Sequence, residues 1–248
     1  MKIFSAGILV IGDEILSGRT HDTNSNFIAK NLIQSGIQLN EIKVIHDLED
    51  EIIKCVLEFS KKYTYVFTTG GIGPTHDDIT SESISKAFNR TYEYHTEAYN
   101  ILQKYYANSD FNESRKKMAK MPSNVELIHN PITFAPGFKI ENVFVLPGVP
   151  EIMEKMFLEL LKKIKKGPPK NIITIKTDLY ESVIASFLSE MQIKFKECSI
   201  GSYPFFNFAT QKAGVNIVIS SWTKTKLDDI VLEIQNRIKF KGGKSSIV

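Results

Sequence analysis

The chain has 248 residues, of which 42% are hydrophobic and 24% are charged, the balance of an ordinary soluble globular protein. This length favours one main domain with a smaller appendage. The 31 basic and 28 acidic residues leave a formal net charge of +3, which is too small to argue for a nucleic-acid partner. No apolar run is long enough to predict a membrane-spanning helix.

The N-terminal run at 3–12 is almost entirely apolar and ends in glycine, a pattern typical of a central strand buried on both faces. Asp13 and Glu14 interrupt this run, which argues against a secretory signal peptide. Cys55 and Cys198 have no C-x-x-C partner, so the sequence carries no zinc or redox signature. We therefore expect free thiols and a reducing cytoplasm.

Strand and helix patterns alternate over the next part of the chain. Helical spacing of apolar residues predicts helices at 23–36, 47–63 and 78–89. Apolar runs rich in β-branched and aromatic residues predict strands at 37–45 and 64–71. The alternation predicts a mainly parallel sheet with helices on both faces.

The middle of the chain is predicted to be more helical. The stretch 95–121 has helical character and is stopped by Pro122, and 130–140 is a loop punctuated by proline and glycine. The segment 142–170 predicts a strand, a tight turn and a helix, with Pro150 at a first helical position.

The clearest linker in the chain is formed by Gly167, Pro168 and Pro169. Beyond it, short strand and helix patterns predict a small α/β appendage of about 70 residues. We therefore expect a main domain at 1–167, which carries the site, and a small C-terminal α/β domain at 171–245.

One loop has an unusual composition. The stretch 68–80, TTGGIGPTHDDIT, holds three glycines, one proline and two adjacent aspartates directly after a predicted strand. Backbone N–H groups of a glycine-rich turn before a helix bind phosphate, and ligands of open α/β sheets lie at the carboxyl ends of the strands. The glycines permit a positive φ or a close approach of the ligand: Gly70, Gly71 and Gly73.

The two aspartates of this loop, Asp77 and Asp78, would repel a phosphate by themselves. A divalent cation removes the conflict, since magnesium binds one or two carboxylates and completes its shell with substrate phosphate oxygens. The loop therefore predicts a site for a metal-bound phosphate ester or pyrophosphate. The alternative is that one aspartate only caps the helix that begins near Thr80.

Further polar residues follow the ends of neighbouring predicted strands. Asp13 and Glu14 come after the first strand, and Asp47 comes after the second, so acidic residues are expected at one edge of the sheet. His76 is a candidate proton shuttle or a bystander. Arg115 is a candidate phosphate contact or an ordinary surface arginine.

These residues resemble the molybdopterin-binding-domain superfamily, and within it the N-terminal branch of the competence/damage-inducible protein A family. The matching segments lie in the family's order: 12–32, 68–80, 111–122, 130–138 and 143–157. The segment SIGSYPFF also resembles a piece of the domain attached to eukaryotic FAD synthases. No part resembles the amidohydrolase domain that ends full-length members, so a stand-alone form is expected.

The resemblance implies a three-layer α/β/α fold with a nucleotide or pterin site at the glycine loop. Molybdenum-cofactor enzymes of the superfamily adenylylate molybdopterin or insert metal, whereas the competence-type and FAD-synthase-type branches are associated with hydrolysing pyrophosphates such as ADP-ribose or FAD. We therefore expect metal-dependent hydrolysis of a nucleotide pyrophosphate. The alternatives are adenylylation of molybdopterin in molybdenum-cofactor biosynthesis and a nucleotide- or pterin-binding module without turnover.

The resemblance also implies roles for single residues. Asp78, Asp77 and Asp13 are expected to be catalytic, and Asp77 and Asp78 are expected to hold a divalent ion, Mg²⁺, Mn²⁺ or Co²⁺. The other candidate positions are expected to bind substrate: Gly12, Glu14, Asn24, Asp47, Thr69, Gly70, Gly71, Gly73, Pro74, Thr75, Thr80, Asn130, Pro136, Gly137, Pro147, Gly148 and Glu151.

One segment departs from the family pattern. The branch usually reads NPVGTAPGF where this chain reads NPITFAPGF, so Thr133 and Phe134 replace a glycine and a threonine. The change bears on the substrate preference and not on the fold. Because relatives assemble, we expect a cytoplasmic homo-oligomer that binds a small nucleotide or pterin and neither nucleic acid nor a membrane.

Overall fold

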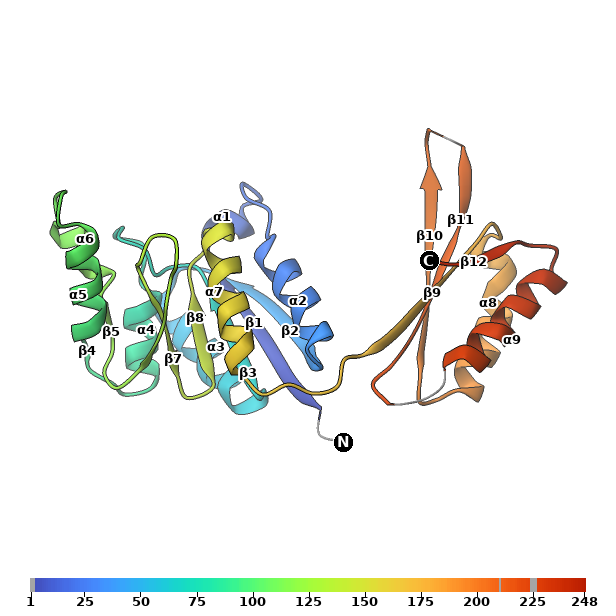
Figure 1. Cartoon of the computed structure of the whole chain (residues 1–248), viewed down its shortest axis with the longest axis horizontal. Coiled ribbons are helices and arrows are strands. Elements are labelled where there is room, and N and C mark those ends of the chain that lie inside the picture. The colour runs from blue at the N-terminus through green and yellow to red at the C-terminus, as the bar shows by residue number, and fades with distance from the viewer. Residues whose placement is uncertain (1–2, 210, 224–226) are drawn as a thin grey trace. The chain divides into compact units, whose positions relative to one another are not determined.

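The structure is a computed structural model that describes residues 3–209, 211–223 and 227–248. The chain forms two compact units, Met1–Gly167 and Pro168–Val248, so the boundary falls at the predicted glycine–proline linker (Figure 1). Within the described ranges, no helix is long and apolar enough to cross a membrane.

The N-terminal unit is built on a six-stranded sheet with the order β2-β1-β3-β8-β7-β6. The first four strands of this order are parallel to one another, and the last two pair antiparallel, which confirms the predicted mainly parallel sheet. In chain order the strands are β1 (Phe4–Ile11), β2 (Ile37–Ile45), β3 (Tyr65–Thr69), β6 (Glu126–Ile128), β7 (Gly137–Ile140) and β8 (Val143–Leu146).

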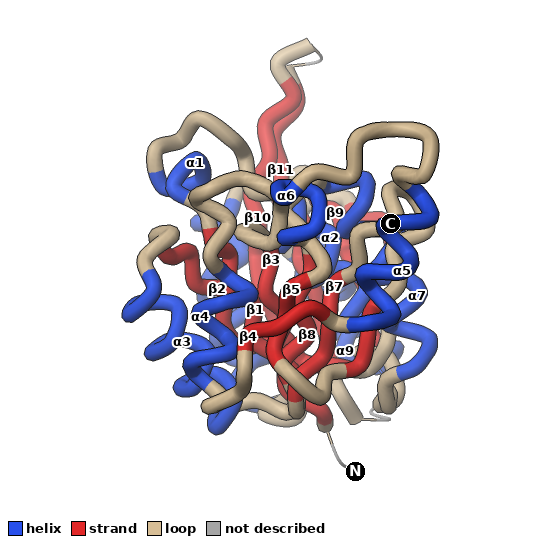
Figure 2. The backbone as a smooth tube through the Cα atoms, turned by 90° about the vertical axis from the view of Figure 1, so that its left-hand side faces the viewer, coloured by secondary structure: helices blue, strands red, loops and turns tan. Residues whose placement is uncertain are grey.

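Helices cover both faces of this sheet, which confirms the three-layer α/β/α fold. One face packs against α2 (Asn24–Gln34) and α7 (Pro150–Lys163) in a core that includes Phe67 and Phe157. The other face packs against helices of a second core: α3 (Glu49–Lys62), α4 (Thr80–Ala87) and α5 (Thr96–Tyr105). Figure 2 shows α3 on one side of the strands and α7 on the other.

Local sequence explains where these helices begin and end. Pro150 occupies the first turn of α7, as predicted, because its fixed φ suits a helix and its missing N–H has no intrahelical acceptor there. Gly36 follows α2 with a φ of 69°, a left-handed conformation that glycine adopts without steric cost. Acidic residues open α3 and lysines close it, which complements the helix dipole.

The prediction of one helical stretch at 95–121 is wrong in part. The structure has α5, then a break, then the short helix α6 (Glu113–Lys117) with Asn112 as its N-cap. The end of the stretch is a strand, β5 (Lys120–Pro122), which pairs antiparallel with β4 (Tyr92–Tyr94). The predicted loop at 130–140 likewise ends in β7, which gains its hydrogen bonds from β6 and β8.

The C-terminal unit is a four-stranded antiparallel sheet with the order β10-β11-β9-β12. Its strands are β9 (Asn171–Thr177), β10 (Ser199–Asn207), β11 (Lys212–Ser221) and β12 (Ser245–Ile247). Two helices, α8 (Glu181–Lys194) and α9 (Leu227–Phe240), pack on one face around a separate core. Cys198 in this core and Cys55 in the N-terminal unit are buried and free.

Candidate functional site

Four parallel strands of the N-terminal unit end at one edge of the sheet, which we call the strand-end edge. The strands β1, β2, β3 and β8 end there, at Ile11, Ile45, Thr69 and Leu146. The Gly70 N–H donates to the Leu146 carbonyl at 3.1 Å, so the loop at residues 70–78, the glycine loop, is joined to the turn after β8. The topology therefore brings the predicted loop, the residues after β1 and the turn containing Gly148 to one place.

Each of the three glycines of the loop is needed for its own physical reason. Gly70 has a φ of 103°, and a Cβ there would lie 2.1 Å from the Ile11 carbonyl oxygen. Gly71 has a φ of 66°, and its Cβ would lie 2.1 Å from Thr80 Oγ1. Gly73 does not have a positive φ, and a Cβ there would lie 2.7 Å from Asp78 Oδ2. The first two positions need the backbone freedom of glycine, and the third makes room for a carboxylate.

The two aspartates of the loop fold back onto Thr75. The Thr75 N–H donates to Asp78 Oδ2 at 2.8 Å, and the Thr75 hydroxyl lies 2.6 Å from the same oxygen. The hydroxyl is also within hydrogen-bonding distance of Asp77 Oδ1, and this contact lowers the pKa of Asp77. Ile79 is the N-cap of α4 and no side chain caps it, so neither aspartate serves as the helix cap.

The arrangement around Thr75 fits a divalent cation. The Thr75 hydroxyl has one proton for two close carboxylate oxygens, one of Asp77 and one of Asp78, so the negative charge of the pair is only partly offset. A cation would neutralise this negative charge. In the described part of the chain, no group of three or more His, Cys, Asp or Glu residues forms a metal site by itself. Substrate oxygens would therefore have to complete the ion's shell.

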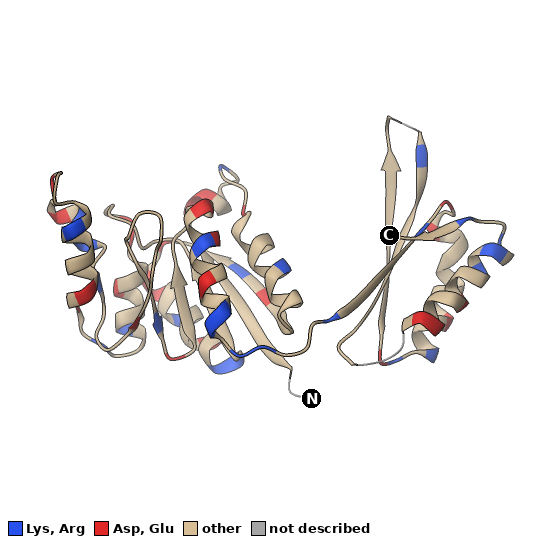
Figure 3. Cartoon of the chain, in the orientation of Figure 1, with Lys and Arg blue, Asp and Glu red and all other residues tan. Residues whose placement is uncertain are grey.

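A second acidic group lies at the ends of β1 and β2. The Asp13 N–H donates to Asp47 Oδ2 at 3.0 Å, and His46 Nδ1 lies 2.8 Å from Asp13 Oδ1. Burial raises the pKa of Asp47, and the negative charges of Asp13, Glu14 and Asp77 raise it further, against the hydrogen bond from Asp13. The carboxylates of the loops after β1, β2 and β3 therefore act on one another and make this edge of the sheet negatively charged. Figure 3 shows acidic residues on α1 (Asp13–Leu16) and in the first turn of α7.

His46 is a residue that the sequence interpretation missed. Its side chain is 54% exposed and that of its partner Asp13 is 68% exposed, so both are open to solvent. The only signal in the sequence was a histidine directly before Asp47 at the end of a predicted strand. Nothing local predicted that it would reach across to the loop after β1.

Buried hydroxyl and amide oxygens gather around the same edge. Within the described residues, the buried side-chain atoms that lack a hydrogen-bond partner are Asn24 Oδ1, Ser25 Oγ, Thr68 Oγ1, Thr69 Oγ1 and Thr80 Oγ1. They come from the end of β3 and from the starts of α2 and α4. An unpaired buried polar group costs about 1–3 kcal/mol, so this clustering favours a site that ligand or water completes.

Asn24 links two of these parts directly. Its Nδ2 donates to the Gly148 carbonyl at 2.7 Å, which joins the start of α2 to the turn after β8. Asn24, Thr69 and Thr80 were predicted from sequence, whereas Ser25 and Thr68 were missed. Those two are adjacent to predicted positions, but sequence alone does not show that their oxygens are buried without a partner.

The loop at 130–136 is shaped by Asn130, which is 5% exposed. Its Oδ1 accepts hydrogen bonds from the N–H groups of Ile132 and Thr133, and its Nδ2 donates to the Ala135 carbonyl. A Cβ at Gly137 would lie 2.2 Å from the Val145 carbonyl oxygen. In this structure Asn130 therefore holds the loop in shape from within, and Gly137 allows its close approach to β8.

The side chains of Glu151 and His76 occupy more open positions, whereas Gly12 and Pro136 are buried. Glu151 is exposed in the first turn of α7, and the side chain of His76 is 99% exposed. The interpretation of Arg115 as a phosphate contact is not supported. Its guanidinium donates to the Asp110 carbonyl and lies 4.3 Å from the centre of the Tyr106 ring, so it is used within its own segment.

The fold and the edge together define a three-layer α/β protein with a glycine-rich loop and carboxylates at the ends of parallel strands. A family model described as "Probable molybdopterin binding domain" matches residues 7–166, more than half of the chain, and the chain belongs to this family. A second model, described as "FAD synthase, middle domain", matches residues 171–242.

Relatives and a solved structure agree with this assignment. A curated protein of Archaeoglobus fulgidus is 36% identical over 197 residues, which cover 79% of this chain and 84% of the relative. A putative competence-damage inducible protein of Clostridium botulinum is 36% identical over 199 residues, which cover 75% of this chain and 48% of the relative.

The solved structure is that of the protein CinA with unknown function from Thermoplasma acidophilum. It is 34% identical, covers 64% of this chain and 96% of its own chain, and superposes with a TM-score of 0.60. The predicted resemblance to the competence/damage-inducible branch is confirmed.

Proposed function

We propose that the N-terminal unit hydrolyses a nucleotide pyrophosphate such as ADP-ribose or FAD, with the help of a divalent metal ion. The observation that carries this proposal is the glycine loop itself. It combines left-handed backbone at Gly70 and Gly71 with two carboxylates, Asp77 and Asp78, that share one hydroxyl. Phosphate-binding amides beside carboxylates are what a metal-bound pyrophosphate requires.

The backbone would bind the phosphate oxygens. The N–H groups of Gly70, Thr75 and Asp78 already donate within the protein. The other N–H groups of the glycine loop and the positive end of α4 would attract an anion. The unpaired hydroxyls of Thr69 and Thr80 supply further donors next to the loop. This combination positions the pyrophosphate, and positioning with charge stabilisation provides most of the rate in phosphoryl transfer.

The carboxylates would hold the ion and receive the proton. Asp77 and Asp78 would hold Mg²⁺, Mn²⁺ or Co²⁺, which when bound polarises a phosphoryl oxygen. Water attacks one phosphorus, the bridging P–O bond breaks, and AMP forms together with the partner phosphate. Asp13, whose Oδ1 already bonds His46, would orient the water and accept its proton.

A second candidate is molybdopterin binding with adenylylation, in molybdenum-cofactor biosynthesis. It is favoured by the match to a family of probable molybdopterin binding domains. A nucleotide- or pterin-binding module without turnover has the same binding requirements.

Cytoplasmic location and assembly into a homo-oligomer also remain predictions, and sedimentation velocity would test the assembly.

The test is turnover of purified protein with ADP-ribose, FAD and NAD, each with Mg²⁺, Mn²⁺ or Co²⁺ or with chelator, followed by chromatography. AMP released only with metal would support the hydrolase. Asp78→Asn should abolish this release with the fold intact, whereas Asp50→Asn, an exposed aspartate in the first turn of α3, should leave it unchanged. Binding of a pterin or nucleotide without any product would favour the second candidate.

A further inference from the structure

We propose that Phe134 and Tyr105 form a stacking platform for the planar heteroaromatic ring of the nucleotide. This inference rests on the proposed function, because it takes the glycine loop as the site of the phosphates. It goes beyond that function by naming the part of the substrate that is recognised and the residues that recognise it.

The position of Phe134 follows from the sheet topology. β7 runs antiparallel to β8, with Phe138 opposite Val145, so the loop before β7 emerges where β8 ends. The turn after β8 lies against the glycine loop, since a Cβ at Gly148 would be 3.4 Å from Gly70 Cα. The loop that carries Phe134 and the glycine loop therefore emerge at the same edge of the sheet.

Tyr105 reaches this region from another part of the chain. It is the last residue of α5, and its ring centroid lies 4.9 Å from that of Phe134, with the planes tilted by 35°. The segment after α5 is also tied to the glycine loop, because Lys117 Nζ donates to the Thr75 carbonyl. Both rings thus belong to elements that are joined to the phosphate-binding region.

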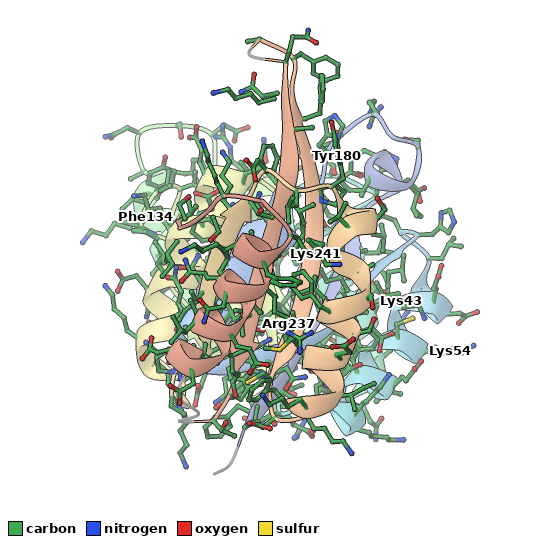
Figure 4. The ribbon with its side chains drawn as sticks, turned by 90° about the vertical axis from the view of Figure 1, so that its right-hand side faces the viewer. Lys43, Lys54, Phe134, Tyr180, Arg237 and Lys241 are labelled. Carbon is green, nitrogen blue, oxygen red and sulfur yellow. The ribbon has the colours of Figure 1, made fainter. Side chains whose placement is uncertain are left out.

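The platform is exposed although its backbone is strained. Phe134 has a φ of 61°, a conformation that is unfavourable for a bulky side chain, and the residue is still 45% exposed. Tyr105 is 46% exposed. Burial of Phe134 therefore does not explain the strain, and strained residues that their surroundings hold in place cluster at ligand sites. Phe134 is labelled in Figure 4.

Further rings pack next to Tyr105. Tyr106 meets Tyr105 edge-on at 4.9 Å, and its other neighbour Phe111 lies nearly parallel to it at 6.1 Å. The Arg115 guanidinium covers the Tyr106 ring. Rings held in this way keep their orientation, and an exposed, preoriented aromatic surface stacks well on the flat face of a base.

The experiment compares two non-hydrolysable probes by isothermal titration calorimetry with Mg²⁺: α,β-methylene-ADP, which has a base, and methylenediphosphonate, which has none. Phe134→Gly should weaken binding of the first by about 5- to 100-fold and leave the second unchanged. Phe134→Tyr, which keeps the ring, should restore the affinity. Phe240→Ala removes an exposed ring of the C-terminal unit and should leave both affinities unchanged.

The outcomes separate this inference from the proposed hydrolysis. Unchanged affinity of Phe134→Gly for α,β-methylene-ADP overturns the platform, as does an equal loss for both probes, which would indicate a loop effect. If Phe134→Gly changes the sedimentation coefficient but not the affinity, the platform is overturned and the two rings form a contact between copies of the chain. Loss confined to the base-containing probe supports it even if no substrate is turned over, and a wild-type protein that binds neither probe overturns both proposals.

Discussion

Gly73 and Asp78 show how a single missing side chain shapes the candidate site. The Asp78 carboxylate occupies the space where a Cβ of residue 73 would lie, and there it accepts hydrogen bonds from Thr75. Sequence reasoning identified both residues as part of a site, but it assigned Gly73 to backbone freedom as readily as to close approach. The structure shows close approach of a carboxylate of the same loop.

Replacement of Gly73 by alanine is expected to displace the Asp78 carboxylate without straining the backbone, since residue 73 does not have a positive φ. We predict that Gly73→Ala lowers metal-dependent turnover on the order of 10- to 100-fold, because a misplaced catalytic group costs this much. The midpoint of thermal unfolding should stay close to that of the wild type.

Gly18→Ala is the matched control for this variant. Gly18 has a φ of 71° and no atom within 4 Å of a Cβ, so alanine there adds backbone strain without a clash. It should lower stability and spare turnover. Equal loss of turnover in both variants would contradict the role given to the Asp78 carboxylate.

Asp47 gives a prediction about pH. Burial and neighbouring carboxylates raise its pKa in the folded state, so the folded protein binds more protons than the unfolded chain between the ordinary pKa and the raised one. Stability therefore falls as the pH rises through this window. Asp47→Asn removes the penalty and keeps an oxygen for the Asp13 N–H, so in chelator the variant should unfold at a higher temperature than wild type at pH 7.

This difference should vanish near pH 3, where Asp47 is protonated in both states. Circular dichroism melts at both pH values measure it, with Asp50→Asn as the control for loss of one surface charge. A variant that melts below wild type at pH 7 would contradict the assignment, since it would mean that the ionised carboxylate stabilises the fold.

At the scale of elements, the segment between α4 and β6 departs most from the sequence prediction. A single helical stretch was predicted, and the structure has two helices enclosed by the antiparallel pair β4–β5. The residues that break the helix, Asn108 to Asn112, favour turns and caps because their side chains compete for backbone hydrogen bonds. The break directs α6 toward the glycine loop, where Lys117 contacts Thr75.

Lys117→Met should loosen the glycine loop, because it removes the ammonium group that bonds the Thr75 carbonyl and keeps the alkyl stem. We expect faster hydrogen exchange at residues 70–78 and a several-fold higher KM, with exchange in α5 unchanged. Lys104→Met, in the last turn of α5, is the matched control. Slow loop exchange in Lys117→Met would show that the contact does not order the loop.

At the scale of the whole molecule, the two units have separate hydrophobic cores. The two N-terminal clusters use buried residues between Ala6 and Leu161, and the C-terminal cluster uses those between Ile175 and Ile238. A unit that contains its own core can fold alone. All residues proposed to act on the pyrophosphate lie in the first unit.

We therefore predict that a fragment of residues 1–167 folds cooperatively and keeps the metal-dependent turnover of the full chain to within about twofold. Chemical denaturation and the chromatographic assay measure the two properties. A folded fragment without turnover would show that the C-terminal unit contributes to the reaction, and an unfolded fragment would contradict the independence of the cores.

The sequence by itself determined the alternation of strands and helices, the mainly parallel sheet and the glycine loop, because these depend on the spacing of apolar residues and on local glycine and proline chemistry. It also placed Asp13 and Asp47 at the ends of strands and Asp78 in the glycine loop. Only the tertiary structure decided the antiparallel β6, β7 and β12, since short strands gain their hydrogen bonds from distant partners.

Contacts between distant loops were beyond the sequence for the same reason. His46 meets Asp13 across 33 positions, and Asn24 meets Gly148 across 124 positions. The exposed pair of Phe134 and Tyr105 joins two segments that no local pattern connects. Local pattern fixes which residues reach the end of a strand, whereas the packing of the strands decides which of them meet there.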